Sequence, residues 1–408
     1  LLSISSSENN AEILAFQTAL ALHCFTNEYL YDQNDIEIEA LEVLENLANN
    51  KLTAGKQPTP KELACLASYK ALYEYSWIEL VTMPVELQEL ERRQIIDPEE
   101  EKQLRSKMPM LQEINDNVSR KVREQYEKNP YPRWINTRLR LAPKPISVVT
   151  KEINLNIKGS SINEIKNPQI LIAGCGTGQH SIGTAVSFKD CDVLAIDLSL
   201  SSLAYAKRKT EELGISNIEY MQADILDLGA LNRQFDIIES GGVLHHMDDP
   251  MAGWEVLAGC LKAGGLMKIG LYSELARSHI VQIRHEIQQS NIGSSNDAMK
   301  SFRRMMVSSK EEHHNMEVLS PDFYSMSTFR DLLFHVQEHR FTIPKIKDCL
   351  AQLGLTFCGF ESDKTVKKFK SEYPSENAAY DLDRWDAFEK ENPREFSGMY
   401  QFWCQKIV

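Results

Sequence analysis

The chain has 408 residues, of which 42% are hydrophobic and 25% are charged, and its net charge is −13 at pH 7. These values are typical of a globular protein with one large or two ordinary domains. The negative charge argues against a nucleic-acid substrate, because phosphate binding needs a basic surface. No apolar run reaches the roughly 18–20 residues of a membrane span, so we expect no membrane segment.

The eight cysteines are scattered along the chain and form no Cys-x-x-Cys pair. This spacing is typical of free thiols in a reducing compartment, so we expect a cytoplasmic protein without disulfides. The first residues, Leu1–Ser7, have neither the basic start nor the long apolar run of a secretory signal peptide. The chain begins without methionine, and the sequence leaves open whether it is a piece of a longer polypeptide.

Helical spacing of apolar residues dominates the N-terminal part. The pattern is clear over residues 11–31 and again over 36–47. No β pattern interrupts it before residue 126. We therefore expect an all-α N-terminal domain over residues 1–125, and this domain could also make a dimer.

Two segments of this region carry helix-start signals. Thr59-Pro60-Lys61-Glu62 is a capping box with proline at the first helical position, and it predicts a long helix to about residue 81. Asp97-Pro98-Glu99-Glu100 predicts another start of the same kind. Residues 110–128 predict a last helix with a polar face.

An extended segment, Tyr126-Glu-Lys-Asn-Pro-Tyr131-Pro132-Arg133-Trp134, follows these helices. Two prolines within three residues hold the backbone extended. A plain linker would more often be rich in glycine and serine or in charge than carry these aromatic and arginine side chains. We expect the segment to reach the ligand site of the next domain; the alternative is a structural strap between two domains.

The most informative segment is Gln169-Ile-Leu-Ile-Ala-Gly174-Cys-Gly176-Thr-Gly178-Gln-His180. A short apolar run ends in three alternating glycines, and a helix-like stretch follows. The pattern predicts a buried parallel strand whose end brings a ligand against bare backbone, where a Cβ would meet the ligand or forbid a positive φ. Asp197 ends a second apolar strand, 192–197, where it can accept two hydrogen bonds from a ribose diol.

The spacing of the glycines excludes two other nucleotide sites. A dinucleotide fingerprint needs Gly-x-Gly-x-x-Gly/Ala, whereas here the third glycine comes one residue early and position 179 is glutamine. No Lys-Ser/Thr pair follows, so the turn is not a P-loop. A ribose-binding acid without a phosphate cradle suits a nucleoside that carries no phosphate.

Three further segments follow at regular separations. Residues 218–226 predict a third strand that ends at Asp224, and 235–250 predict a fourth strand followed by a loop with His245 and His246. Residues 261–272 predict a glycine turn before a fifth strand.

Taken in order, these segments resemble class I S-adenosylmethionine-dependent methyltransferases over residues 168–273. The string from Tyr126 to Trp134 resembles a bacterial group of this class, in which a similar Tyr-Glu-x-Asn-Pro-Tyr-Pro-Arg-Trp string precedes the core and some members carry tetratricopeptide repeats. No 34-residue repeat is visible here. The resemblance implies a Rossmann-like α/β domain over 126–408. Its seven-stranded sheet would have the order 3-2-1-4-5-7-6, an antiparallel strand seven and helices on both faces.

S-adenosylmethionine is the cofactor that the resemblance implies, with Asp224 and its neighbours holding the adenine amino group. Cys175 is expected to be a small residue that fits the tight turn rather than a reactive thiol. Arginine suits a bidentate contact with the cofactor carboxylate. The expected cofactor-binding residues are Gly174, Cys175, Gly176, Thr177, Gly178, Gln179, His180, Asp197, Leu198, Ala223, Asp224, Ile225, Ser240, Gly241, Tyr126 and Arg133.

His245, His246 and Tyr131 are the expected catalytic residues. A neutral imidazole can take a proton from an O–H or N–H nucleophile near pH 7. The alternative role of the histidines is to close the cofactor pocket. We expect methyl transfer to an N or O nucleophile of a small molecule or a peptide. The alternative is a catalytically silent cofactor-binding module that acts as a protein partner.

The stretch 273–342 separates the fifth strand from the next αβ unit, 343–360, and is much longer than an ordinary connection of about 2–6 residues. It shows helical patterns over 274–289 and 327–339 around a Gly/Ser break, and we expect it to be a lid over the substrate. The tail 396–406 alternates and predicts the last strand.

We expect no metal. His335 and His339 are spaced i, i+4 on a predicted helix, which can bind zinc, but the His-Glu-x-x-His pattern is missing. His313 and His314 lie in a charged stretch and are weaker candidates. The lysines 364, 367, 368 and 370 predict a solvated loop.

Overall fold

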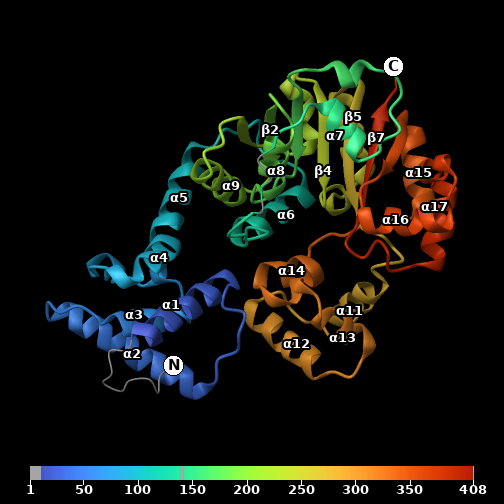
Figure 1. Cartoon of the computed structure of the whole chain (residues 1–408). Helices are drawn as coiled ribbons and strands as arrows, with labels where there is room; N and C mark the ends of the chain where they lie inside the picture. The colour runs from blue at the N-terminus through green and yellow to red at the C-terminus, as the bar shows by residue number, and fades with distance from the viewer. Residues whose placement is uncertain (1–10, 138, 140–141, 408) are drawn as a thin grey trace. The chain divides into compact units, whose positions relative to one another are not determined.

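The structure is a computed structural model, and it describes residues 11–137, 139 and 142–407 (Figure 1). The chain divides into two compact units. One contains the N-terminal residues up to Gln103 together with Ile283–Phe334, and the other contains Leu104–Gln282 together with the chain from His335 onward. The predicted domains, 1–125 and 126–408, divide the chain differently, because most of the expected lid groups with the N-terminal helices.

A seven-stranded sheet of order β3-β2-β1-β4-β5-β7-β6 forms the centre of the second unit. β1 to β5 pair in parallel, and β7 pairs antiparallel with both β5 and β6. This confirms the predicted fold class and strand order. The strands are β1 (Gln169–Ala173), β2 (Asp192–Asp197), β3 (Ile218–Gln222), β4 (Phe235–Gly241), β5 (Leu261–Leu271), β6 (Leu355–Phe360) and β7 (Tyr400–Lys406).

Alternating side chains of the central strands fill two apolar cores. Ile170 and Ile172 of β1 belong to one core, and Leu171 and Ala173 belong to the other. Successive residues of a strand face opposite sides of the sheet, so an apolar run buried on both sides needs helices on both faces. Figure 1 shows these helices around the strands. They are α6 (Asn117–Lys128), α7 (Ile146–Glu152), α8 (Gln179–Ser187), α9 (Leu200–Glu212), α10 (Pro250–Cys260), α15 (Ile343–Gln352), α16 (Asp363–Glu372) and α17 (Leu382–Glu391).

The outer edge of β3 is partly covered by a short segment around Met110. The Gln222 N–H donates to the Pro109 carbonyl over 2.8 Å, and the Leu111 N–H donates to the Gln222 carbonyl over 2.9 Å. The helix predicted to start at residue 110 therefore starts later, because residues 109–111 are extended. Asp116 caps α6 by accepting the Ser119 N–H over 2.8 Å.

Helices make up the described part of the first unit. The remaining helices of the chain are α1 (Ala11–Thr26), α2 (Asp35–Thr53), α3 (Pro60–Ala67), α4 (Gln88–Glu91), α5 (Asp97–Lys107), α11 (Ser278–Gln289), α12 (Asn296–Ser308), α13 (Glu312–Val318) and α14 (Met326–Phe334). α5 does begin at Asp97, although a π-helical turn, Arg92–Ile96, leads directly into it. α11 and α12 are separated at the predicted Gly/Ser break.

The capping box at Thr59 is confirmed, but the helix that it starts is short. Glu62 and Thr59 exchange hydrogen bonds between side chain and backbone. α3 then ends at Ala67 and does not continue to residue 81, because the buried amide of Gln94 takes over two backbone groups. It donates to the Ala67 carbonyl over 3.2 Å and accepts the Leu72 N–H over 2.9 Å.

Two other predictions about secondary structure are wrong. α14 ends at Phe334, so His335 and His339 do not share a helix face. The lysines near residue 367 lie on α16 rather than in a loop, and Lys368 binds Asn392 and Glu395 over 2.6 Å.

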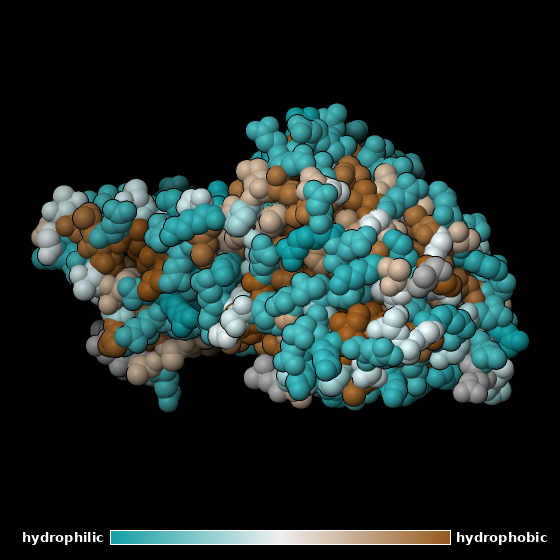
Figure 2. All heavy atoms as spheres, turned by 90° about the horizontal axis from the view of Figure 1, so that it is seen from above, coloured by the Kyte–Doolittle hydropathy of each residue, from teal (hydrophilic) through white to brown (hydrophobic). Residues whose placement is uncertain are grey.

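The surface drawn in Figure 2 is mainly hydrophilic, with apolar side chains scattered among polar ones. Within the described residues, no helix combines the length and hydrophobicity that a membrane span requires. All eight cysteines are buried and free, as their spacing predicts.

Candidate active site

The predicted glycine turn joins β1 to α8 at the carboxyl edge of the sheet. Gly176 has a φ of 52°, and a Cβ there would lie 2.8 Å from the Tyr131 carbonyl oxygen. At Gly174 a Cβ would lie 2.3 Å from a methyl group of Val243. The glycines therefore let other parts of this chain approach the turn, a reason that the sequence did not reveal. They also leave a strip of bare backbone.

Asp197 ties the glycine turn to the end of β2. Its carboxylate accepts the Gly176 N–H over 2.8 Å and the Ser199 N–H over 2.9 Å. Burial raises the pKa of the Asp197 carboxyl above its usual value, and these two hydrogen bonds oppose that rise. Leu198 is held next to it, because the Gln222 amide donates to the Leu198 carbonyl over 2.7 Å.

Asp224 holds the equivalent position at the end of β3. Its carboxylate accepts the Leu226 N–H over 3.0 Å and a hydrogen bond from Ser119 of α6. Burial raises the pKa of this carboxyl as well. The neighbouring Ala223 and Ile225 are buried, and the Ala223 N–H donates to the Asp197 carbonyl over 3.1 Å. The predicted ribose and adenine acids therefore lie at adjacent strand ends.

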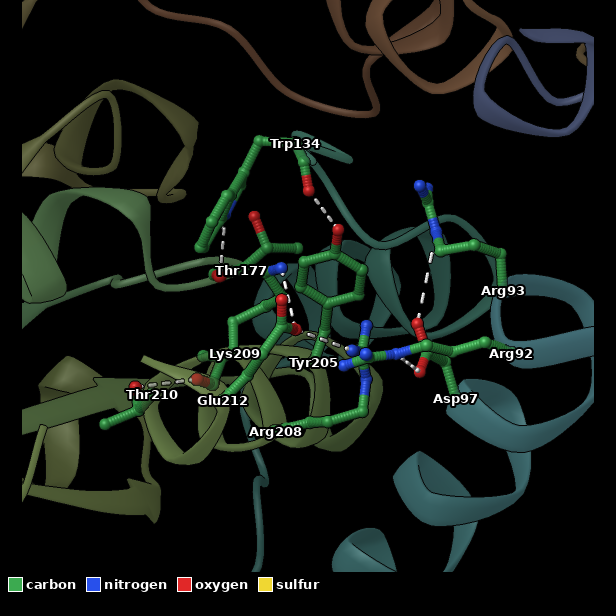
Figure 3. Close-up of polar contacts among 11 residues, drawn as sticks. Arg92, Arg93, Asp97, Trp134, Thr177, Tyr205, Arg208, Lys209, Thr210 and Glu212 are labelled. Atoms are coloured by element: carbon green, nitrogen blue, oxygen red, sulfur yellow. Dashed lines mark hydrogen bonds and ion pairs between the residues drawn. The ribbon is translucent and has the colours of Figure 1, made fainter. Parts of the chain in front are cut away.

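The proline-rich string is bound to the glycine turn through its backbone and through Trp134 (Figure 3). The Trp134 indole N–H donates to the Thr177 carbonyl over 3.0 Å, and the Thr177 hydroxyl donates to the Pro132 carbonyl. The Tyr205 hydroxyl of α9 donates to the Trp134 carbonyl. Arg133 is half-buried in the same segment. This places the string beside the glycine turn; whether Arg133 contacts a cofactor stays a prediction.

Glu127, which precedes the prolines, was not among the predicted site residues. Its carboxylate accepts the Ser199 hydroxyl over 3.0 Å and the Ser201 N–H over 3.1 Å. Since Ser199 also binds Asp197, the string is fastened to the loop after β2 as well. α9 begins at Leu200, so the Glu127 carboxylate lies at the N-terminus of this helix, where a negative charge is stabilising.

The first residues of α8 point to a second missed acid. Gln179 is exposed, whereas His180 forms an ion pair with Glu239 of β4. Thr184 donates to the same carboxylate over 3.0 Å. Burial opposes ionisation of Glu239, but His180 and the nearby Lys268 bring its pKa down to about 2. A glutamate inside the apolar run of β4 is the sequence signal that could have revealed this pair.

Ser240 and Gly241 end β4, and His245 follows in a 3-10 turn, Leu244–His246. The Ser240 hydroxyl and both ring nitrogens of His245 are buried and have no hydrogen-bond partner among the described residues. The His245 ring stacks on Tyr272 with 3.8 Å between centroids. Burial, helped by His246 and Arg277, lowers the pKa of His245 well below its usual value, so this imidazole is neutral.

His246 has a defined orientation. Its Nδ1 lies 2.7 Å from the Gln337 carbonyl oxygen. Because a carbonyl only accepts, the neutral ring carries its proton on Nδ1 and its basic lone pair on Nε2. The ring stacks on His335 with 3.6 Å between centroids.

His335 links the two predicted groups of catalytic residues. Its Nε2 lies 3.1 Å from the Tyr126 hydroxyl, and the Tyr126 ring stacks near Tyr131 at 6.4 Å. The His339 N–H, from the same segment, donates to the His245 carbonyl over 2.7 Å. His335 and Gln337 were not predicted for this role. Gln337 acts through its backbone oxygen, and since every residue type has this atom, the sequence could not indicate the contact.

Residues 170–265 match the family model described as a methyltransferase domain. The chain carries a class I S-adenosylmethionine-dependent methyltransferase domain. An uncharacterised protein of Synechococcus sp. is 30% identical over 205 residues, which cover 48% of this chain and 49% of that protein. The release factor glutamine methyltransferase of Flavobacterium psychrophilum is 36% identical over 102 residues, 24% of this chain and 34% of that enzyme. The chain thus spans about half or less of the length of these curated relatives.

Among solved structures, PKMT2 from Rickettsia typhi in complex with AdoHcy is similar with a TM-score of 0.48 and 15% identity. The similarity covers 66% of this chain and 53% of that one.

The methyltransferase domain has residues that fit S-adenosylmethionine. The glycine turn offers bare backbone beside the Asp197 carboxylate, and Asp224 stands at the next strand end. The buried Ser240 hydroxyl without a partner adds a polar atom that a ligand can satisfy.

Proposed function

We propose that the protein transfers a methyl group from S-adenosylmethionine to an oxygen or nitrogen atom of a small molecule or a peptide. The observation that carries the proposal is that the glycine turn, Asp197 and the 3-10 turn with His246 meet at one edge of the sheet. The cofactor, when bound, supplies the methyl group on a sulfonium. The residues of the chain have to orient the acceptor and remove its proton.

The cofactor roles follow from the strand ends. Asp197 is placed to accept from the ribose hydroxyls, and Asp224 with Ala223 and Ile225 to border the adenine. Support comes from the backbone hydrogen bonds that fix both carboxylates. Arg133 is the proposed partner of the cofactor carboxylate, because its segment is fastened to Thr177.

His246 is a better candidate for the base than His245. Its Nδ1–H is held by the Gln337 carbonyl, which directs the basic lone pair to Nε2. His245 is fully buried and its pKa is strongly lowered, so it is a weak base. We propose that His245 forms the wall of the acceptor site and that the Tyr126–His335 pair supports the His246 ring through stacking. Tyr131 is then a neighbour of this group rather than the base.

The acceptor is proposed as a class only. The Flavobacterium relative is named for a glutamine acceptor, which is an amide nitrogen, and this supports nitrogen as one candidate. The net charge of −13 disfavours nucleic acid as the acceptor. The eight buried, free thiols support a reducing compartment such as the cytoplasm.

The alternative is a silent module that binds the cofactor and a partner protein. The acidic pair Asp248-Asp249 and the helical N-terminal region would fit such a partner-binding role, but Asp249 already has a structural role. Its carboxylate caps α10 by accepting the Met251 N–H over 2.9 Å. The enzyme is therefore the better supported function.

Calorimetry followed by an acceptor screen tests the proposal. S-adenosylhomocysteine should bind with one site per chain, and Asp197→Ala should weaken it by about 1.5–3 kcal/mol, since a charge-assisted hydrogen bond is lost. Tighter binding of NAD would exclude the assigned cofactor. Labelled methyl transfer is then followed on alcohols, amines and peptides. Cofactor binding without transfer to any of these classes would favour the silent module.

The expected covering of the acceptor by residues 273–342 stays a prediction. Hydrogen exchange of this stretch should slow when cofactor and acceptor are both added.

A further inference from the structure

We propose that Glu286, His313 and His314 form a binding site for one divalent transition metal ion, with zinc as the best candidate. The three residues belong to the part of the chain between Ile283 and Phe334. They take no part in the methyl transfer proposed above, and the inference does not depend on it.

The donor atoms of these residues converge. His313 Nε2 lies 2.5 Å from Glu286 Oε1, and His314 Nε2 lies 2.8 Å from Glu286 Oε2. One ligand atom from each residue lies within 4.8 Å of the other two. Two imidazoles and one carboxylate are a common ligand set of zinc and other first-row metals, with the remaining positions taken by water. Imidazole donors disfavour magnesium and calcium, which prefer oxygen.

The convergence of two adjacent histidines is unusual for a helix. α13 (Glu312–Val318) supplies both His313 and His314, and neighbouring residues of a helix point roughly 100° apart. Here both rings turn toward one carboxylate, with 4.4 Å between their centroids. Without a metal, the two imidazole N–H groups could donate hydrogen bonds to the Glu286 carboxylate. A carboxylate that reaches the surface can accept hydrogen bonds from water instead, so it does not require both rings.

His314 has the second contact that a metal-bound histidine usually makes. Its Nδ1 lies 2.8 Å from the Ser309 hydroxyl oxygen, which also accepts the Glu311 N–H over 3.1 Å. A hydroxyl can donate or accept, so it tolerates the tautomer with the proton on Nδ1 and the lone pair on Nε2. The His314 side chain is only 4% exposed, and the Phe302 ring packs edge-on against it. These contacts hold the ring before a metal arrives.

A metal at this position would connect α11 with α13 across the intervening α12. Glu286 and His314 are separated by 28 residues, so the cross-link closes a loop of that length. Binding to the folded state alone raises stability by mass action. A saturating concentration of zinc should therefore raise the melting temperature of the whole chain, by on the order of 5 °C.

Zinc titration of the full chain tests the site after treatment with a chelator and removal of the chelator. We expect one ion per chain, with a dissociation constant in the micromolar range or tighter. Glu286→Gln and His313→Gln should each weaken binding at least tenfold, while the melting temperature without metal changes little. His285→Gln is the matched control, because this exposed neighbour on α11 binds only Gln289 in the described contacts and should leave zinc affinity unchanged.

Cobalt adds a readout that does not depend on stability. Cobalt bound to histidine and carboxylate should show visible absorption bands that disappear in Glu286→Gln. A thiolate charge-transfer band would instead assign the metal to a cysteine and overturn the proposal. Absence of stoichiometric zinc binding would overturn it as well, as would equal affinity in the parent, Glu286→Gln and His313→Gln proteins.

Discussion

The two halves of the carboxyl edge of the sheet differ in how their polar groups are satisfied. At the ends of β1 and β2, the Asp197 carboxylate accepts two backbone N–H groups, and the Thr177 carbonyl accepts the Trp134 indole. At the end of β4, the Ser240 hydroxyl and both ring nitrogens of His245 are buried and have no hydrogen-bond partner among the described residues. A buried polar atom without a partner costs about 1–3 kcal/mol, so the second half is built at the expense of stability.

This difference indicates which half of the edge already has its binding geometry before a ligand binds. We expect the cofactor to bind to the half whose hydrogen bonds are complete, so that little reorganises there. The acceptor should bind to the half that has unsatisfied groups. Substitutions in the first half should change cofactor affinity, and substitutions in the second half should change turnover.

The largest expected effect comes from His246→Gln. Turnover should fall by roughly 10²–10⁴-fold, the usual contribution of a general base, while cofactor affinity stays within about twofold. Single-turnover methyl transfer and calorimetry measure the two quantities. His339→Gln is a control, because its ring contacts only Gln337 and the Asp248 carbonyl in the described contacts. Unchanged turnover in His246→Gln would show that His246 is not the general base.

Glu239→Gln should lower stability by about 1.5–3 kcal/mol, because the charge-assisted hydrogen bond between the buried Glu239 carboxylate and the partly exposed His180 is lost. The pKa of Glu239 lies at about 2 in the folded protein, below its usual value of 4.5. Its stabilisation is therefore present above pH 4.5 and is lost as the pH falls toward 2. When the pH is lowered from about 5, which lies above this window, to about 3, which lies inside it, the urea midpoint should decline more steeply in the parent than in the variant.

Glu219→Gln is the matched control for this experiment, since Glu219 forms an exposed ion pair with Arg233. It should change stability by less than about 1 kcal/mol. Parallel acid profiles of the parent and Glu239→Gln would contradict the assigned role of Glu239.

Gly176→Ala tests the first half through its backbone. The φ of 52° and the approach of the Tyr131 carbonyl to 2.8 Å both disfavour a Cβ. The strain of about 1–2 kcal/mol should weaken cofactor binding by roughly tenfold. Gly183→Ala, in the middle of α8 with open space around it, should instead raise stability by about 0.5–1 kcal/mol. Equal cofactor affinity in the Gly176→Ala protein would mean that the turn adapts.

The smallest expected effect comes from Ser240→Ala. Removing an unpartnered hydroxyl should leave the free energy of unfolding unchanged or slightly higher, within about 0.5 kcal/mol. Ser181→Ala should lose about 1 kcal/mol, because its hydroxyl donates to the Gly178 carbonyl over 3.0 Å. Denaturant titration of both variants compares the two halves directly. If Ser240→Ala lowered the free energy of unfolding as much as Ser181→Ala does, the proposed difference between the two halves of the edge would be wrong.

The first half of the edge could be predicted from the sequence because its signals are local and depend on backbone geometry. The glycines, the apolar strands and Asp197 follow one another at short separations. The second half depends on contacts between distant parts of the chain. The tautomer of His246 is set by a carbonyl 91 residues away, and any residue type offers that oxygen.

The helical regions show the same limit. The capping box at Thr59 correctly marks a helix start, but the end of α3 is set by the Gln94 amide, 27 residues from the carbonyl that it binds. The predicted helix over 327–339 exists as α14 but ends early, at Phe334, for a related reason. Its last residues turn away to contact the 3-10 turn at His245, as the bond from the His339 N–H shows.

The extended residues around Met110 have a consequence for solution behaviour. β3 lies at the edge of the sheet, and an open edge offers N–H and C=O groups that can pair with a strand of another molecule. Residues 109–111 occupy the two backbone groups of Gln222, and the charged Glu219 stands on the same strand. A chain shortened to begin after Leu111 would keep the whole sheet and the glycine turn, yet it would present a free strand end to its neighbours and should aggregate more readily.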